Sequence, residues 1–333
     1  MIELIGFVVL CFLSVLIIIS ESRELLRYLY IPSLLTFLVI VRLNAFVFHS
    51  FEIDILTYAL EMQATSFDFY YLREFVFWFG IRFIYYITQS ELFSFIVLDF
   101  FWVYILLKTS PKESGRLGKG LILILATSFP FFFGYENIYR QFYATVVLLY
   151  SYSLIEIKPN RSFYMFIISV FIHNLSLFLV PLFIIRKCYT FKIQDRIVLS
   201  SIVSGIYIFS LPFIMSFKDA DPTEIDLSYL YLLLFLSACV LFFYKFKNDV
   251  LSVIRLFPSL FPASILIIGF VFHGQEMIAE RLGMMFIPFL IYDFYLFSNT
   301  IIASSKRRLF RLALFLVFSI PVLIFSSSMI FFD

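Results

Sequence analysis

Residues 134–157 read GYENIYRQFYATVVLLYSYSLIEI, a short polar turn that runs directly into a long apolar stretch. At helical spacing Asn137, Arg140 and Gln141 fall on one face, and Glu136 stands four residues before Arg140, where the two side chains can pair. An arginine at the edge of hydrocarbon either anchors to lipid headgroups or binds an anionic ligand. The stretch therefore predicts a membrane helix that opens with an interfacial or anion-binding turn.

The composition places the rest of the chain in a membrane as well. Of its 333 residues 62% are hydrophobic, 48 are Phe and only 14% are charged. The net charge of +2 comes from short basic clusters between apolar runs, which report membrane orientation and do not indicate nucleic-acid binding. We therefore expect an all-α, polytopic integral membrane protein that forms a single membrane domain over residues 1–333.

Membrane crossings are predicted from the length of each apolar run, since a span needs about 20 residues. This criterion predicts ten spans, at 2–20, 28–48, 91–107, 119–135, 137–156, 197–217, 227–244, 256–272, 281–298 and 309–330. The basic clusters between them should all face the cytoplasm. That arrangement holds only if segments 67–89 and 163–186 each enter and leave on the same side.

The two exceptional segments also differ from simple spans in sequence. Segment 67–89 is rich in aromatic residues and interrupted by charges, so it predicts amphipathic helices on the outer surface, within an outer loop 44–90. Segment 163–186 is interrupted by His173 and the Asn that follows it. It is either a re-entrant helical hairpin or a plain span with a buried, hydrogen-bonded His.

Ionisable residues gather at the predicted outer ends of the helices. Glu52 and Asp54 share a loop, as a general base, as metal ligands or as a solvated acidic loop. A second group follows spacing i, i+3, i+7 and ends beside an arginine; its members are His273, Glu276, Glu280 and Arg281. It is a weak metal motif or a solvated turn. Arginines, carboxylates and a His on one face suit a lipid-anchored phosphate or pyrophosphate.

These segments resemble the EpsG family of Wzy-type polysaccharide polymerases. The resemblance rests on Asn137-x-x-Arg140-Gln141, Phe-Ile-His173-Asn-Leu-Ser, the loop 52–58 and the pair Glu280-Arg281. It implies an enzyme that joins undecaprenyl-pyrophosphate-linked oligosaccharide repeats into O-antigen, capsule or exopolysaccharide. The family is also similar to the GT-C glycosyltransferases, whose first outer loop carries an acidic catalytic motif.

The prediction assigns catalysis to Asp54, with Glu52, and to His173. Pyrophosphate and substrate binding is assigned to Arg140, Arg281, Asn137, Gln141, Glu280, Glu276, His273 and Arg73. No cofactor is expected, although a divalent cation is compatible with the site. The expected partners are the lipid-linked glycan donor and acceptor, membrane lipids and a chain-length regulator. The expected location is the bacterial inner membrane, with the site on its periplasmic side.

Three other functions fit the same features. The first is a GT-C enzyme that transfers one sugar from a polyprenyl phosphate, and the second is a flippase for lipid-linked glycans. The third is a membrane O-acyltransferase that uses the intramembrane His.

The topology makes a direct prediction for chemical labelling in intact cells. A Glu113→Cys variant should resist an impermeant thiol reagent added outside, because Glu113 belongs to a predicted cytoplasmic loop, whereas Asp221→Cys should react. Labelling of the first variant would contradict the reading of 67–89 as a segment that does not cross.

Overall fold

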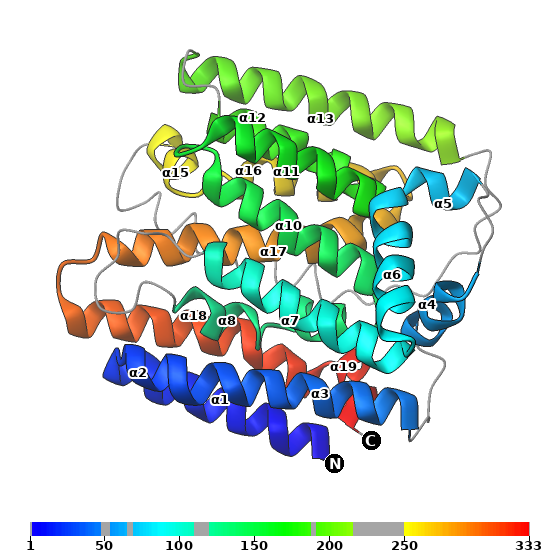
Figure 1. Ribbon diagram of the computed structural model, residues 1–333. Helices are drawn as coiled ribbons and strands as arrows, with labels where there is room; N and C mark the ends of the chain where they lie inside the picture. Colours follow the sequence, from blue (N-terminus) through cyan, green and yellow to red (C-terminus); the bar gives the residue numbers. More distant parts are fainter. Residues whose placement is uncertain are drawn as a thin grey trace. The chain divides into compact units, whose positions relative to one another are not determined.

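The computed structural model describes residues 2–47, 54–64, 69–109, 120–187, 191–215 and 250–332. Throughout these ranges the regular elements are helices, which confirms the predicted all-α fold (Figure 1). Four helical stretches within them are long and apolar enough to cross a membrane: α1 (Ile2–Ser20), the run Arg23–Val47, α7 (Glu91–Thr109) and α17 (Glu276–Asn299). The run comprises α2 (Arg23–Leu25), η1 (Leu26–Tyr30) and α3 (Ile31–Val47). These stretches support the predicted membrane character and match four of the predicted spans.

The predicted span 119–135 is divided into α8 (Leu121–Leu125) and α9 (Phe129–Glu136). The division has a local cause. The hydroxyls of Thr127 and Ser128 donate to carbonyls of α8, at 2.9 and 2.7 Å. Pro130 then lies in the first turn of α9, where its missing N–H is tolerated.

The other predicted spans correspond to helices of different lengths. They are α10 (Tyr139–Leu154), α13 (Ile193–Met215), α15 (Val250–Leu256) with α16 (Leu260–Phe272), and α18 (Ser304–Ile324) with α19 (Ser326–Met329) and η3 (Ile330–Phe332). The predicted span 227–244 lies outside the described residues. The total of ten spans is therefore not confirmed.

The two exceptional segments contain short helices. Segment 67–89 holds α5 (Phe69–Arg73) and α6 (Phe75–Thr88), after α4 (Asp54–Met62) of the same outer loop. The 14 residues of α6 extend about 21 Å, less than the roughly 30 Å of a hydrocarbon core. In Figure 1, α6 runs across the direction of α7 and α10. The location of α5 and α6 on the outer surface stays a prediction.

Segment 163–186 is interrupted where its sequence predicts. The helix α11 (Pro159–Ile172) ends immediately before His173, and η2 (Asn174–Leu179) and α12 (Val180–Lys187) follow. The interruption is confirmed, and it is compatible with both a re-entrant hairpin and an interrupted span.

The chain forms two compact units. The first comprises Met1–Leu154, Asn160–Asn174 and Ser298–Asp333, and the second comprises Ile155–Pro159 and Leu175–Phe297. In the first unit α7 packs against α3, α6 and α10, while α1 packs against α3 and α18. In the second unit α13 packs against α12 and α16.

Aromatic packing fixes the start of α10 in the first unit. The ring of Trp102 stacks on Tyr135 at a centroid distance of 6.1 Å and meets Phe142 edge to face at 5.2 Å. Gly134 allows this approach, since a Cβ atom there would lie 2.7 Å from Cδ2 of Phe142. The glycine of the opening motif is therefore required by packing.

A buried ion pair joins α3, α7 and α10. The guanidinium of Arg42 donates to both oxygens of Asp99, at 2.6 and 3.0 Å, and both residues are 0% exposed. Trp102 Nε1 and the Tyr139 hydroxyl also donate to Asp99, at 3.0 and 2.9 Å. Such a pair is tolerated in an apolar interior because its charges are mutually compensated and hydrogen-bonded.

We expect Arg42→Leu to lower the free energy of unfolding in detergent micelles by about 3–5 kcal/mol, since it leaves the Asp99 carboxylate buried and uncompensated. The double variant Arg42→Leu/Asp99→Leu should recover much of this loss. Denaturant unfolding of the purified protein measures both, with Lys306→Leu on the exposed surface as the control. Equal stability of Arg42→Leu and wild type would contradict the assigned role.

Candidate functional site

The candidate site is centred on Glu74, which occupies the junction between α5 and α6 and is only 2% exposed. Its Oε2 atom accepts from the Arg140 guanidinium at 2.5 Å. Its Oε1 atom lies 2.8 Å from His173 Nδ1 and accepts from the Asn174 backbone N–H at 3.3 Å. One carboxylate therefore joins three segments that are far apart in the sequence.

The side chains of Glu74, Arg140 and His173 are positioned by the ends of three helices. Arg140 lies in the first turn of α10, and His173 directly follows α11, with its N–H bonded to the Ser169 carbonyl at 2.9 Å. Glu74 occupies the cap position of α6 with φ −124° and ψ 46°, outside the helical region. All three side chains are thus carried at helix termini.

The surroundings of Glu74 keep its carboxyl group ionised. Burial alone would raise its pKa, but the hydrogen bond of His173, the charge of that ring when it is protonated, the charge of Arg140 and the Asn174 N–H outweigh burial and lower the pKa to about 2. An ionised carboxylate only accepts hydrogen bonds, so His173 must donate from Nδ1. Nε2 is then the ring atom that can take up or release a proton.

Aromatic rings surround the guanidinium of Arg140. Its central carbon lies 5.3 Å from the ring centroid of Tyr58 on α4 and 5.0 Å from that of Trp78 on α6. The two rings meet edge to face at 5.9 Å. A cation over aromatic faces is held in place while its polar edge remains directed toward an anion.

The predicted residues Asp54 and Asn137 adjoin this cluster. The Asp54 backbone N–H donates to Asn137 Oδ1 at 3.1 Å, and the Tyr58 hydroxyl donates to the Asp54 carboxylate at 3.4 Å. Asp54 is exposed. The expectation that Asp54 lies on a loop is wrong, because it is the first residue of α4; Glu52 lies outside the described residues.

The predicted pairing of Glu136 with Arg140 is also wrong, because Arg140 pairs with Glu74. Glu136 is buried at the end of α9, and its Oε1 atom has no hydrogen-bond partner within the described residues. The prediction that Asn137 shares a helix face with Arg140 and Gln141 is wrong as well, because Asn137 precedes α10. Gln141 belongs to α10 and is 3% exposed.

The other predicted binding residues lie mostly on the surface. Arg73 is exposed at the end of α5, next to Glu74 in sequence. In the second unit, His273 is exposed after α16 and meets Phe209 edge to face at 5.4 Å. Glu276 and Arg281 are exposed on α17 and Glu280 is half-buried.

No group of three or more His, Cys, Asp or Glu with metal-binding geometry occurs in the described part of the chain. The contribution of Arg281 stays a prediction.

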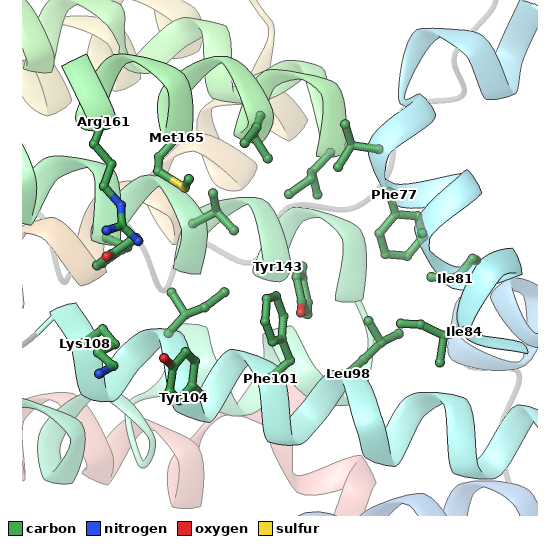
Figure 2. Close-up of a pocket in the computed structure, with 17 residues that line it drawn as sticks. Phe77, Ile81, Ile84, Leu98, Phe101, Tyr104, Lys108, Tyr143, Arg161 and Met165 are labelled. Atoms are coloured by element: carbon green, nitrogen blue, oxygen red, sulfur yellow. The ribbon is translucent and has the colours of Figure 1, made fainter. Parts of the chain in front are cut away.

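An elongated cavity of about 580 Å³ lies in the first unit, bounded by α6, α7, α10 and α11 (Figure 2). Phe77 and Ile172 line it near the Glu74 cluster, since Ile172 precedes His173 and Phe77 lies three residues after Glu74, in the first turn of α6. Lys108 and Arg161 also line it. The cavity therefore runs from the neighbourhood of the carboxylate cluster to a pair of cations.

Sequence reasoning missed Glu74, the residue at the centre of the cluster. The sequence holds no specific signal for it, because segment 67–89 carries several charges and a carboxylate is ordinary in a helix at the membrane surface. Arg140 and His173 are both predicted as site residues, but the sequence does not predict that they contact the same carboxylate.

The low pKa of Glu74 predicts a pH-dependent loss of stability. Because the folded pKa of about 2 lies below the ordinary 4.5, ionised Glu74 contributes fully above pH 4.5, and the contribution is lost as pH falls toward 2. Glu74→Gln should lower the free energy of unfolding by roughly 3 kcal/mol above that window. The difference from wild type should shrink within it.

Unfolding measured at a series of pH values tests this prediction, with Glu24→Gln at an exposed position as the control. A difference between wild type and Glu74→Gln that does not change from neutral to acidic pH would contradict it.

Comparison of the chain with protein families, with curated proteins and with solved structures finds no match. The contacts of the site are therefore the basis for a functional assignment.

Proposed function

We propose that this protein is a membrane glycosyltransferase that polymerises lipid-pyrophosphate-linked oligosaccharide repeats. The observation that carries the proposal is the convergence of Arg140 and His173 on Glu74, beside Asn137 and Asp54. A cation, a carboxylate-bound imidazole and an exposed carboxylate are the groups that this reaction requires.

The proposed chemistry needs one base and one anion-binding group. The acceptor hydroxyl oxygen bonds to the anomeric carbon of the donor, the bond from that carbon to the pyrophosphate oxygen breaks, and the hydroxyl proton passes to the base. We assign this proton to His173 Nε2, because Glu74 holds Nδ1–H and stabilises the imidazolium that forms. Asp54, exposed at the start of α4, is the alternative base.

Arg140 is the proposed ligand of the pyrophosphate. A guanidinium carries five N–H donors in a planar fork, so it can bond Glu74 and phosphate oxygens together. Its side chain is 18% exposed, which leaves it accessible. Negative charge grows on the leaving pyrophosphate in the transition state, and a fixed cation stabilises that state most. The roles of Arg281 and Glu280, which belong to the second unit, in phosphate binding stay predictions from the sequence.

The finer features predicted from the sequence and from the resemblance belong to the same proposal. They are ten spans, a GT-C-like arrangement, a bacterial inner-membrane location and a periplasmic site. The leaving lipid pyrophosphate supplies the activation, so no nucleotide is needed. Donor and acceptor are the lipid-linked glycans.

The test is purified protein in proteoliposomes supplied with lipid-linked repeats and no nucleotide sugar, with the products separated by size. Wild type should give a ladder. Arg140→Ala should reduce polymer by about a hundredfold or more, through loss of charge stabilisation. His173→Gln should reduce it by about a hundredfold to ten-thousandfold, through loss of the base.

Arg255→Ala, which removes an exposed arginine of α15, is the matched control and should retain the ladder. In cells, Arg140→Ala and Arg281→Ala should each leave single repeats displayed without polymer. Long chains made by Arg140→Ala would refute the assignment of the pyrophosphate site.

A membrane O-acyltransferase is the second candidate, and one observation favours it. The cavity reaches Ile172, the residue before His173, so an acyl chain that lies in it with its thioester toward that end would bring its carbonyl carbon near the imidazole. Transfer of a radioactive acyl group from acyl-CoA to a glycan, in the same proteoliposomes and without ladder formation, would select this function.

A further inference from the structure

We propose that the cavity between α6, α7, α10 and α11 binds an anionic glycerophospholipid, with its phosphate on Lys108 and Arg161 and one acyl chain along the cavity. The proposed phosphate site lies at the end of the cavity away from the Glu74 cluster. The proposal is independent of the reaction that the protein catalyses.

The cationic end of the cavity carries charge that suits a phosphate. Lys108 lies near the end of α7 and Arg161 in the first turn of α11, and both are exposed. Lys108 Nζ lies 5.2 Å from the Tyr104 ring centroid and the Arg161 guanidinium carbon 5.6 Å from that of Tyr150. Within the described ranges neither cation has an acidic partner. Two uncompensated cations at one cavity mouth attract an anion.

The rest of the cavity suits hydrocarbon. Figure 2 shows Arg161, Lys108 and Tyr104 at one end and Phe77, Ile81 and Ile84 at the other. Between them the wall is mainly apolar. Gly80 faces open space, since a Cβ atom built there has no neighbour within 4 Å. The volume of about 580 Å³ falls in the range of roughly 300–1,000 Å³ typical of ligand pockets.

The length of the cavity matches one leaflet of a bilayer. Arg161 and Ile172 both lie on α11 and line the cavity. Their separation along the helix axis is about 16 Å at 1.5 Å per residue. This is close to half of a hydrocarbon core of about 30 Å. One acyl chain whose headgroup lies at the Lys108 end would therefore fill the cavity.

The position of both cations at one end of the cavity favours a phospholipid over a polyprenyl tail as the ligand. A polyprenyl chain that entered from the Glu74 end would bring its hydrocarbon terminus against two cations, which gains nothing from their charge. A phospholipid that enters from the other end places its phosphate there. Lys108 and Arg161 also belong to clusters predicted to face the cytoplasm, where the leaflet surface is negatively charged.

The experiment measures lipid binding to the full-length purified protein in detergent. Native mass spectrometry and the unfolding midpoint are followed as phosphatidylglycerol or neutral phosphatidylcholine is added. We expect one retained phosphatidylglycerol and a raised midpoint, with weaker binding of phosphatidylcholine. Lys108→Gln and Arg161→Gln should each weaken phosphatidylglycerol binding about fivefold, and the double variant about 25-fold.

Filling the cavity provides a test that does not depend on charge. Gly80→Leu places a side chain in the open space and should weaken binding of both phospholipids. Its matched control is Gly205→Leu on α13, because Gly205 also has no neighbour within 4 Å of a built Cβ atom. Lys192→Gln/Lys306→Gln removes two exposed cations that do not line the cavity and should bind as wild type does. An unchanged midpoint in lipid-free detergent establishes that each variant is folded.

Three results would overturn the proposal. One is equal binding of the two phospholipids, and another is unchanged phosphatidylglycerol binding in the double variant or in Gly80→Leu. The third is displacement of phosphatidylglycerol by undecaprenyl phosphate whose own binding is insensitive to Lys108→Gln/Arg161→Gln. That result would assign the cavity to a polyprenyl tail.

Discussion

The Glu74 carboxylate is the interaction on which the candidate site depends. It is nearly inaccessible to solvent, yet it binds an arginine from α10, an imidazole that follows α11 and a backbone N–H. Burial of a charge is costly unless partners compensate it, so the three segments must be held together for the carboxylate to be tolerated. The same requirement orients His173 and gives its two ring nitrogens different roles.

Local patterns predicted the individual groups more successfully than their partners. The sequence predicts Arg140 as a costly charge and His173 as the point where a helix is interrupted. Both predictions need only the few residues on either side. Helical spacing relates only residues that are close in the sequence, so it predicts Glu136 as the partner of Arg140, which is wrong. The true partner, Glu74, lies 66 residues away, and nothing in the local pattern relates the two segments.

Two other features show the same limit. The prediction that Asp54 lies in a loop is wrong because α4 has only nine residues, so a search for membrane-length apolar runs does not detect it. Its buried residues Ile55, Tyr58, Ala59 and Met62 nevertheless follow helical spacing. The division between α8 and α9 arises from hydroxyls that bond to their own helix and from Pro130 at the next helix start. A criterion based on apolar length alone does not detect such a division. Arg42 and Asp99 each lie in a predicted span, where a charge needs a partner, but the local sequence does not identify that partner.

The Arg42–Asp99 pair has a consequence for biosynthesis. The two residues are 57 positions apart, so at about 5–20 residues per second several seconds of translation separate them. During that interval an isolated α3 would expose a lone guanidinium to lipid, at a cost of about 2.5–3.5 kcal/mol on translocon scales. Pairing with Asp99 offsets this cost, so we expect stable insertion of α3 to be favoured once α7 has emerged from the ribosome.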